Sequence, residues 1–481
     1  MGITNGDVLT SHGNVAGRRA VLRIIEAGLA AADAYDKVEQ LVRVEGNRLI
    51  VGHRPFEPAG SPVSGDEVYD LDTLGRILVL GAGKGVQRAA KAIEDILGDR
   101  LTGGHIIDKK GGEVILDRVE VTLGAHPVPD EDCVRGCRRI LELTRGLTPD
   151  DLVFTIGASG FSSLLTLPVP GVSLEDVRRT VHLMQIERGA PTADLSPIRN
   201  HLDKLKGGRI SAHIHPARAI HLMAKDPGEY DDLIHNSYWF HTLPDRATFG
   251  DAVASLTKWR AWDAVPASVR AFLERADPRW ETIKPAEYLG YSFRIFGLLP
   301  GQQGNWPAPC AAAEALGYRP VLLTDELFAE AAEAGRVVAA IARAIARKGA
   351  PFEAPVALIT GGELLVTVGS EGGIGGRNQE YALAAALAIA GSDRIVVGAV
   401  DTDGTDGPGS QYVANADYPT LAGALVDGHT VAEARAADID LHTVLTRHNT
   451  TPALLALDSA ILATQNTGLR DLGVVLVMGD G

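Results

Sequence analysis

Short apolar runs alternate with amphipathic stretches along most of the chain. Val21, Ile24, Ile25 and Leu29 recur at helical spacing. Later runs rich in aliphatic and branched residues are typical of buried strands. Many of these runs are followed first by small residues and then by a stretch with helical spacing. The expected strands are Arg76–Leu80, Gly104–Ile107, Val119–Leu123, Asp151–Ile156, Ala219–Ala224, Tyr291–Phe296, Pro320–Leu323, Pro355–Ile359, Glu363–Val368, Arg394–Val400 and Val474–Met478. The expected helices are Ala16–Val38, Val86–Leu97, Glu131–Gly146, Leu174–Arg188, one that opens at Ser196-Pro197, Ala247–Arg260, Pro266–Arg275, Pro307–Leu316, Asp325–Arg347 and Tyr381–Ala390.

This alternation predicts the α/β fold class, with two Rossmann-like α/β domains built on mostly parallel sheets. Residues 276–288 are rich in proline and charge, so we expect one domain over residues 1–285 and a second over residues 286–481. Residues 225–246 combine aromatic and charged side chains without a period, which predicts a long loop over a binding site.

Composition and charge narrow the set of partners. Hydrophobic residues make up 45% and charged residues 22%, as in ordinary globular proteins. The net charge of -15 argues against nucleic acid but permits a small anionic substrate, because a local basic pocket can override it. No apolar segment of signal-peptide type follows Met1, the apolar runs are too short for a bilayer, and three cysteines make no disulfide framework. We therefore expect a cytoplasmic protein that binds neither nucleic acid nor a membrane.

Two glycine-rich loops each carry a cation just before or at the start of an expected helix. Gly81–Gly85 reads GAGKG and holds Lys84, and Gly372–Glu380 reads GGIGGRNQE and holds Arg377. A helix N-terminus with a neighbouring cation suits an anion, whereas a tight turn with a solvated cation is the plain structural alternative. The first loop is neither a P-loop nor a good dinucleotide fingerprint, since the third glycine would fall on Val86.

Three further segments carry candidate chemistry. Hydroxyl groups of Ser159 and Ser162 lie in a small-residue loop after an expected strand, and residues 199–209 are locally basic. Asp401, Asp403 and Asp406 follow another strand, and such a cluster commonly holds a hard cation. Local turns and solvated side chains are the alternatives. Ligands of parallel α/β sheets bind beyond the strand C-termini, so we expect the loops with Lys84, Ser159, Glu363, Arg377 and Asp403 to face one cleft.

Six motifs occur in an order that resembles the class II glycerate 2-kinase family, also known by the names MOFRL and DUF4147. They are Gly81–Lys84, Gly124–Asp130, Arg199–Leu202 with Lys206–Gly208, Thr360–Glu363, Gly375–Glu380 and Thr402–Gly407, and the resemblance runs from about Ala16 to the C-terminus. It implies two α/β domains with the active site in the cleft between them. It also implies Mg²⁺-dependent transfer of the ATP γ-phosphoryl group to the 2-hydroxyl of D-glycerate.

The resemblance assigns roles to individual residues. Lys84 and Arg377 match the family's catalytic cations, and both suit phosphoryl transfer, which depends on positioning and charge stabilisation. The expected substrate-binding residues are Arg199, His201, Lys206, Ser159 and Ser162. The expected cofactor-binding residues are Gly81, Gly83, Gly361, Gly362, Gly375, Gly376 and Asn378, and the expected metal-associated residues are Asp403, Asp406 and Glu363. The expected cofactors are ATP and Mg²⁺, the expected partner is a small anionic substrate, and a homodimer is the candidate assembly.

The chain also departs from the family pattern. Ala158–Ser163, with Phe161, stands in place of a Ser-Gly-Gly-Gly-Ser-Ala loop, and Trp239-Phe240-His241 stands in place of Ser-Gly-Pro. Lys225–Glu229, Gly301–Asn305 and Gly409–Asp417 differ as well. These departures predict a divergent sugar-acid kinase whose pocket has aromatic walls from Phe161, Trp239 and Phe240.

Three alternatives stay open at this point. One is a non-kinase enzyme, an isomerase, lyase or hydrolase, that acts on a small carboxylate or phosphorylated anion without nucleotide; His126, His201 or His241 would be its acid–base groups. Another is a catalytically silent binding subunit, against which the retained cations argue. Dehydrogenase activity ranks last, because the glycine motif is incomplete.

Overall fold

The structure is a computed structural model that describes residues 2–237, 239–299, 306–368, 372–407, 409, 417–466, 468 and 470–479. The departing segment Gly301–Asn305 and most of Gly409–Asp417 lie outside these residues. The chain divides into two units, each with its own core: Ala34–Gln302, here called the parallel-sheet unit, and Met1–Asp33 with Gln303–Gly481, called the mixed-sheet unit.

The parallel-sheet unit alternates strands and helices, as its hydrophobic pattern predicts. Its elements are α3 (Ala34–Leu41), β1 (Val42–Glu45), β2 (Arg48–Val51), β3 (Glu67–Asp70), β4 (Ile77–Ala82), α4 (Val86–Leu97), β5 (Gly103–Lys109), β6 (Glu120–Gly124), α5 (Glu131–Leu143), β7 (Leu152–Gly157), α6 (Phe161–Leu164), α7 (Leu174–His182), α8 (Thr192–His201), α9 (Arg209–Ile214), β8 (Arg218–Met223), α10 (Tyr230–His235), α11 (Phe249–Lys258), α12 (Ala267–Arg275), α13 (Pro285–Tyr288) and β9 (Phe293–Gly297).

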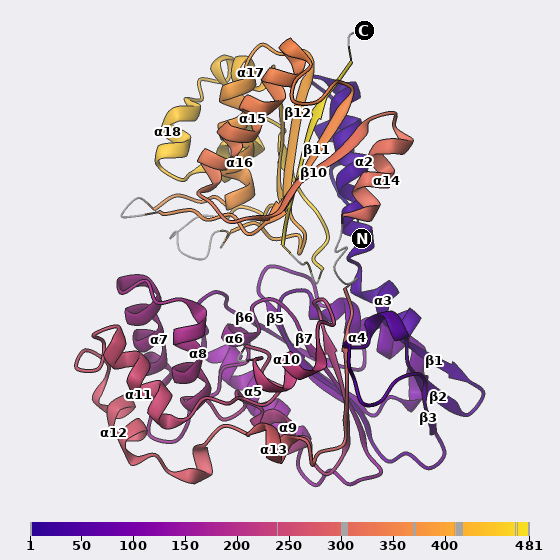
Figure 1. The fold of residues 1–481 in the computed structure, drawn as a ribbon, viewed down its shortest axis with the longest axis vertical. Coiled ribbons are helices and arrows are strands. Elements are labelled where there is room, and N and C mark those ends of the chain that lie inside the picture. The colour runs from indigo at the N-terminus through magenta and orange to yellow at the C-terminus, as the bar shows by residue number, and fades with distance from the viewer. Residues whose placement is uncertain are drawn as a thin grey trace. The chain divides into compact units, whose positions relative to one another are not determined.

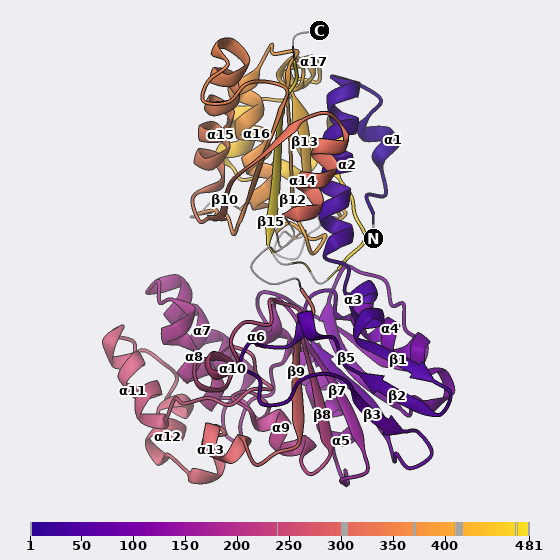
Figure 2. The same cartoon turned by 45° about the vertical axis from the view of Figure 1, so that its right-hand side comes forward.

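The main sheet of this unit is parallel, which confirms the expected topology here. Its order is β6-β5-β4-β7-β8-β9, and every neighbouring pair runs parallel. Figure 2 shows β7, β8 and β9 of this sheet side by side. β4 and β7 are buried along their whole length, because helices cover both faces of the sheet. The C-terminal ends of β4 and β7 therefore lie at one edge, where the loops with Lys84 and Ser159 begin.

The mixed-sheet unit contains the two ends of the chain. Its elements are α1 (Gly6–Leu9), α2 (Val15–Ala31), α14 (Pro307–Ala315), β10 (Arg319–Leu327), α15 (Ala331–Lys348), β11 (Val356–Gly362), α16 (Arg377–Ile389), β12 (Ile395–Asp401), β13 (Gly423–Asp427), α17 (Thr430–Ala436), α18 (Leu441–Thr446), α19 (Thr450–Ala456), β14 (Ala460–Ile461) and β15 (Asp471–Val477).

The sheet of this unit is mixed, so the expectation of mostly parallel strands was wrong here. The order is β10-β11-β15-β12-β13-β14, and within this order only β10 and β11 run parallel. β15 runs against both of its neighbours, and its first residue, Asp471, pairs with Gly362 of β11 and Asp401 of β12. One antiparallel strand thus brings a residue from its N-terminal end to the edge where β11 and β12 end.

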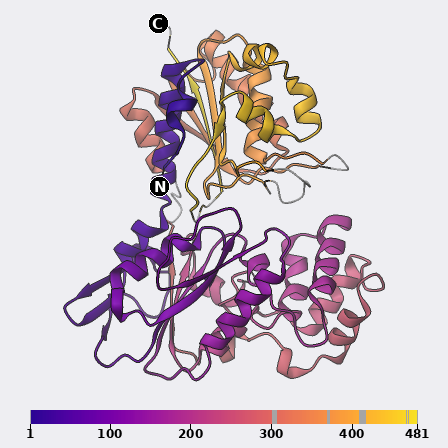
Figure 3. The ribbon, with the colours of Figure 1, turned by 180° about the vertical axis from the view of Figure 1, so that it is seen from behind.

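Helices cover both faces of the mixed sheet. Figure 1 shows α15 and α16 on one side and α2 with α14 on the other, and each side has its own apolar cluster. From behind, the indigo helix α2 lies alongside the yellow and orange strands (Figure 3). Val21 and Ile25 of α2 fill the space that a side chain at Gly398 of β12 would need, so this helix is an integral part of the core.

The two units differ from the expected domains, residues 1–285 and 286–481, at both ends. β9 follows residue 285 but pairs with β8 and completes the parallel sheet. The first 33 residues belong to the mixed-sheet unit, where the fully buried Arg18 Nε lies 2.6 Å from Asp427 Oδ2 of β13. Neither contact is visible in local composition, which was the only basis for placing the boundary.

Several element boundaries also differ from the predicted ones. The helix expected over Ala16–Val38 is two helices, α2 and α3, and α8 begins at Thr192, so that Ser196 Oγ donates within the helix to the Thr192 carbonyl at 2.8 Å. β10 continues through Leu327, where a helix was expected to have begun. Glu363–Val368 is not a strand; in it Leu365 forms an isolated bridge with Glu330. The expected loop over residues 225–246 contains α10.

Within the described residues, no helix combines the length and apolar character that crossing a membrane requires.

Candidate active site

The Lys84 loop connects β4 to α4 at the C-terminal edge of the parallel sheet. The half-buried Lys84 donates its backbone N–H to the Ser159 carbonyl, which lies 2.7 Å away in the loop after β7. A Cβ placed on Gly160 would lie 3.3 Å from Lys84 Cγ and 2.9 Å from His126 Cδ2. The loops after β4, β6 and β7 therefore meet around Lys84, as the parallel topology predicts.

An internal carboxylate caps the start of α4, and sequence reasoning missed it. Asp108, near the end of β5, accepts hydrogen bonds from the amides of Gly85 at 2.8 Å and Gln87 at 3.5 Å. These amides were the expected anion site, so any ligand anion here has to rely on side chains such as Lys84. Burial raises the pKa of Asp108 to about 6, although the hydrogen bonds from Gly85, Lys109 and Gln87 oppose the rise.

The raised pKa of Asp108 predicts a pH dependence of stability. The carboxyl has a pKa of about 6 in the fold against an ordinary value of 3.8, so the folded protein binds this proton more tightly than the unfolded chain. Its stabilising contribution is complete below about pH 4 and is lost as the pH rises through about 6. We expect Asp108→Asn to lack this contribution. Between pH 4 and 6, the slope of unfolding free energy against pH, measured by urea denaturation, should differ between variant and wild type by about 1.4 kcal/mol per pH unit. Equal slopes in wild type and variant would refute the prediction, and Asp150→Asn, an exposed carboxylate, is the control.

Three of the expected substrate-binding residues interact with His241. Ser162 Oγ is 2.8 Å from His241 Nε2, and both Lys206 and Arg199 act electrostatically on this imidazole. Burial lowers the pKa of His241 well below its ordinary value, and the two cations lower it further. Ser162 thus contacts, and Lys206 and Arg199 influence, a histidine that sequence reasoning had named only as an alternative acid–base group.

Three of the expected substrate-binding side chains already have protein partners. Lys206 Nζ lies 2.8 Å from Asp203 Oδ2, and Arg199 Nη2 donates to Gln185 Oε1 at 2.8 Å. The fully buried His201 places Nδ1 2.6 Å from the Pro197 carbonyl and Nε2 2.7 Å from Glu281 Oε1. His201 therefore has both ring nitrogens engaged by protein acceptors, which argues for a structural role.

The aromatic residues that replace small family residues are mostly core residues. Phe161 and Phe240 are 3% and 1% exposed, and their ring centroids lie 5.4 Å apart. Only Trp239 of the three is half-buried, with Lys225 Nζ 4.9 Å from its ring centroid. The expected aromatic walls at Phe161 and Phe240 are thus wrong, because both rings point into the packed interior, where they exclude water.

Arg377 begins α16 and is held by acids from two strands of the mixed sheet. Its Nε donates to Asp471 Oδ1 at 2.8 Å and its Nη2 to Asp401 Oδ2 at 3.0 Å. Nη1 lies 3.8 Å from Glu363 Oε1. Burial alone would lower the pKa of Arg377, but the surrounding carboxylates hold it above its ordinary value, so the guanidinium stays charged.

Asp471 is the central residue of this network and was not predicted. Asn378 Nδ2 donates to its Oδ1 at 2.7 Å, and the Leu364 amide donates to its Oδ2 at 2.7 Å. Burial raises the pKa of Asp471, Arg377 opposes the rise, and the neighbouring Asp401 carboxylate adds to it. Predicting the last strand to start at Val474 left this residue in a loop and hid its role.

The three expected metal-associated residues have different environments. Asp406 caps α16, accepting from the amides of Asn378 at 3.1 Å and Gln379 at 3.0 Å, and Asp403 accepts from the Thr405 amide at 2.8 Å. The Glu363 side chain is 55% exposed. Across the described ranges, no three Asp, Glu, His or Cys side chains are grouped as a metal site.

Packing accounts for the glycines that were expected to bind a cofactor. A Cβ on Gly81 would meet the Ile156 carbonyl, one on Gly83 would meet Ala158, and one on Gly361 would overlap the Trp306 ring. The other three show the same effect: Gly362 faces Leu327 backbone, Gly375 faces Thr450 and His448, and Gly376 faces Asp406. These glycines permit close contact within the protein, and binding of a cofactor by them stays a prediction.

Gly361→Ala tests this packing role without any ligand. The added methyl group would overlap the Trp306 ring, and overpacking of this kind costs about 1–3 kcal/mol. We expect that loss of unfolding free energy in urea denaturation, with Gly372→Ala as control because open space surrounds it. Unchanged stability of Gly361→Ala would show that the site relaxes and that the glycine has another role.

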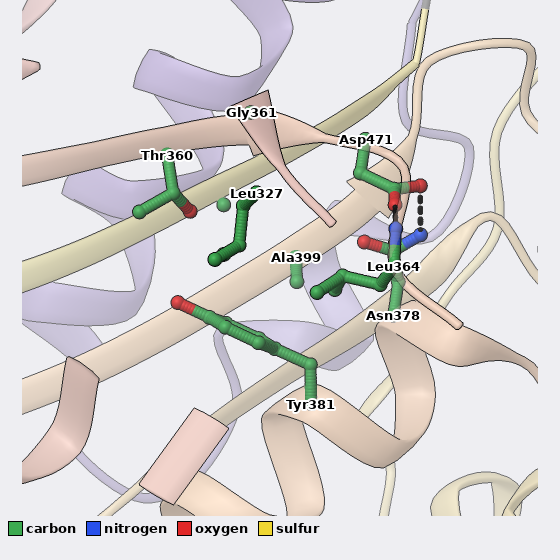
Figure 4. A pocket seen from close by; sticks show the side chains of 9 residues that line it. Leu327, Thr360, Gly361, Leu364, Asn378, Tyr381, Ala399 and Asp471 are labelled. Atoms are coloured by element: carbon green, nitrogen blue, oxygen red, sulfur yellow. Dashed lines mark hydrogen bonds between the residues drawn. The ribbon is translucent and has the colours of Figure 1, made fainter. Parts of the chain in front are cut away.

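A small cavity lies directly beneath the Arg377 network. Leu327, Thr360, Gly361, Leu364, Asn378, Tyr381, Ala399, Asp471 and Gly473 line it. Figure 4 shows Asn378 reaching Asp471 on one side and the Tyr381 ring along the floor. Asn378 and Asp471, which belong to the Arg377 network, form part of its lining, so we assign the cavity to the support of Arg377.

Comparisons with known proteins agree with this arrangement. The domain of unknown function DUF4147 matches residues 20–274, and the MOFRL family matches residues 356–470. The chain is 32% identical over 463 residues to a glycerate 2-kinase of Pyrococcus horikoshii, covering 96% of this chain and 97% of that protein. It is 33% identical to a D-glycerate 2-kinase of Thermotoga maritima, covering 84% of this chain and 91% of that one.

A solved structure is similar over the same length. The crystal structure of a glycerate kinase from Thermotoga maritima has a TM-score of 0.71 and 29% identity, and the match covers 96% of this chain and all of that one. The DUF4147 match alone spans more than half of the chain, and the Pyrococcus horikoshii relative matches nearly end to end. The chain therefore belongs to the class II glycerate 2-kinase family.

Proposed function

We propose that this protein is a kinase that transfers the γ-phosphoryl group of ATP, with Mg²⁺, to a hydroxyl of D-glycerate or a related hydroxy acid. The observation that carries the proposal is the fixed arginine at the start of α16. Asp471 and Asp401 hold its Nε and Nη2 groups, so the guanidinium is immobilised before substrate arrives. Preorganised cations of this kind stabilise transferring phosphoryl groups.

We assign the stabilisation of the transferring phosphoryl group to two cations, Arg377 and Lys84. Arg377 approaches Glu363 through Nη1, and we assign this end of the guanidinium to the phosphoryl oxygens. Lys84 supplies a flexible point charge, which the loop contact with Ser159 positions at the end of β4. Ser162, which contacts His241, and the cations Arg199 and Lys206, which act on the same imidazole, are the candidate contacts for the substrate carboxylate and hydroxyl groups.

The described residues fit a metal that arrives with its nucleotide. Mg²⁺ is commonly held by one or two carboxylates together with phosphates and water. Glu363 is the exposed carboxylate among the three candidates, whereas Asp403 and Asp406 are 2% and 1% exposed. We therefore assign Glu363 as the protein ligand. When bound, the ion would neutralise charge on the phosphate oxygens.

The non-kinase alternative loses much of its support. It rested on altered loops and on histidines as acid–base groups, but Phe161 and Phe240 are core residues and both nitrogens of His201 are engaged. His241 is a poor general base, since burial holds its pKa well below the ordinary value. A small anionic substrate is the expected partner, and the homodimer stays a prediction.

Thermal melting tests nucleotide use directly. A ligand present at about 100 times its Kd stabilises the fold by roughly 2.7 kcal/mol, which raises Tm by several degrees. We expect Mg²⁺ with ATP or ADP to raise Tm, and D-glycerate or a related hydroxy acid to raise it as well. A shift with acids or their phosphates but none with nucleotide would contradict the kinase proposal and favour chemistry without ATP.

A further inference from the structure

Ser162 and His241 form a buried hydrogen-bonded pair beside the Lys84 loop. Ser162 lies on α6, directly after the loop that follows β7, and its Oγ is 2.8 Å from His241 Nε2. His241 is 2% exposed, and its ring centroid lies 5.1 Å from that of Phe161. The imidazole is therefore fixed by packing, with its Nε2 edge facing one hydroxyl.

The environment of His241 determines which nitrogen carries the proton. Burial and the cations of Lys206 and Arg199 keep the pKa low, so the ring is neutral and has a single N–H. Within the described part of the chain, Nδ1 is buried and has no hydrogen-bond partner. A proton on Nδ1 would be an orphaned buried donor, the rarer and costlier arrangement. The proton thus belongs on Nε2, which donates it to Ser162 Oγ.

This tautomer fixes the direction of the serine hydroxyl. Ser162 Oγ accepts from His241, so its own O–H is left to donate elsewhere. Thr166 Oγ1 accepts from Lys206 Nζ at 3.0 Å and donates to the Ser163 carbonyl at 2.7 Å, which places this cation next to the same turn. Ser162 is only half-buried, and Ser159 of its loop contacts Lys84. A half-exposed donor among cations suits an anionic oxygen.

We propose that His241 is a positioning residue that donates to Ser162, so that the Ser162 hydroxyl donates to an anionic oxygen of the hydroxy-acid substrate. The inference rests on the proposed function and adds a specificity-determining pair to it. His241 takes up no proton in this role; it acts as a fixed donor throughout the reaction. Ser162 selects acids that place a carboxylate oxygen at this point.

Four variants separate this role from a structural one. Ser162→Ala and His241→Met remove the donors, whereas His241→Gln retains an amide N–H that can replace Nε2–H. Ser163→Ala is the matched control, because the Ser163 hydroxyl is committed to the Pro127 carbonyl at 2.8 Å. We expect Ser162→Ala and His241→Met to raise KM for D-glycerate roughly 10- to 100-fold, because each loses a hydrogen bond to a charged group. KM for ATP should stay within about twofold of the wild-type value.

The pair should behave as one unit. The double variant Ser162→Ala/His241→Met should be no worse than either single variant, and His241→Gln and Ser163→Ala should resemble wild type. Multiplicative effects in the double variant, a wild-type KM for D-glycerate in either single variant, or an equal rise in KM for ATP would each overturn the proposal.

Two measurements do not depend on kinase activity. D-glycerate alone should raise Tm of the wild type, Ser163→Ala and His241→Gln, but not of Ser162→Ala or His241→Met. If this pattern appears in a protein that transfers no phosphoryl group, the pair is supported and the proposed function fails. No shift in the wild type, or equal shifts in all variants, would overturn the pair. Imidazole nitrogen NMR should show His241 protonated at Nε2, and a proton on Nδ1 would refute the assignment.

Discussion

Replacing Arg377 by methionine is expected to lower kcat roughly 10³-fold or more and to destabilise the fold by about 3–5 kcal/mol. The rate falls because a preorganised charge on the transferring phosphoryl group is removed. The stability falls because Asp471 and Asp401, each 5% exposed at the side chain, lose the cation that they share. Initial rates of ADP formation and urea denaturation measure the two effects separately.

Two variants control the Arg377 experiment. Arg377→Lys retains a charge but cannot donate to Asp471 and Asp401 at the same time, so we expect it to lose most activity as well. Arg394→Met removes an arginine of the same unit whose Nε donates to the Met478 carbonyl at 3.0 Å, and it should lower stability without specific loss of kcat. Wild-type kcat in Arg377→Met would exclude a catalytic role for this guanidinium.

Lys84→Met is expected to lower kcat roughly 10²- to 10³-fold with a stability change of about 1 kcal/mol or less. Lys84 is a half-buried residue in a turn whose backbone contact to Ser159 does not depend on the side chain, so the fold should tolerate its loss. The lost charge affects the transition state more than the ground state, which lowers kcat rather than raising KM.

The matched control for Lys84 lies on the helix that follows it. Lys91 of α4 lies 2.7 Å from the exposed Asp95 and 3.4 Å from the buried Glu94, and Lys91→Met should lower stability but leave kcat unchanged. A Lys84→Met enzyme with wild-type kcat, or one that fails only through unfolding, would show that this cation has no part in the chemistry.

The strand–turn–helix around Lys84 could be predicted because the residues that determine it are neighbours in the sequence. Residues 77–82 are apolar, Gly85 adopts the left-handed conformation at φ +69°, and α4 has a regular apolar face. Because β4 and β7 are parallel neighbours, the loops that follow them meet, and Ser159 lies next to Lys84. The carboxylate at Asp108 was missed because it reaches α4 from the neighbouring strand, and no local pattern records that contact.

Strand direction explains why half of the Arg377 site was not predicted. The sequence shows that residues 474–478 are apolar, but it does not show that β15 runs against β11 and β12. Only that direction places Asp471 beside Arg377. The glycine at position 361 illustrates the same limit: the chain alone does not tell whether Gly361 makes room for a ligand or, as here, for Trp306.

Phosphorus NMR of the purified protein with Mg²⁺, ATP and D-glycerate tests the central claim most directly. The account predicts that ATP is consumed while ADP and a phosphomonoester appear in equal amounts, and that in Arg377→Met and Lys84→Met both signals appear more slowly, in proportion to the lower kcat of each variant. If D-glycerate and a panel of related hydroxy acids yield no phosphomonoester, or if ATP gives only ADP and inorganic phosphate, the chain is not the hydroxy-acid kinase proposed here.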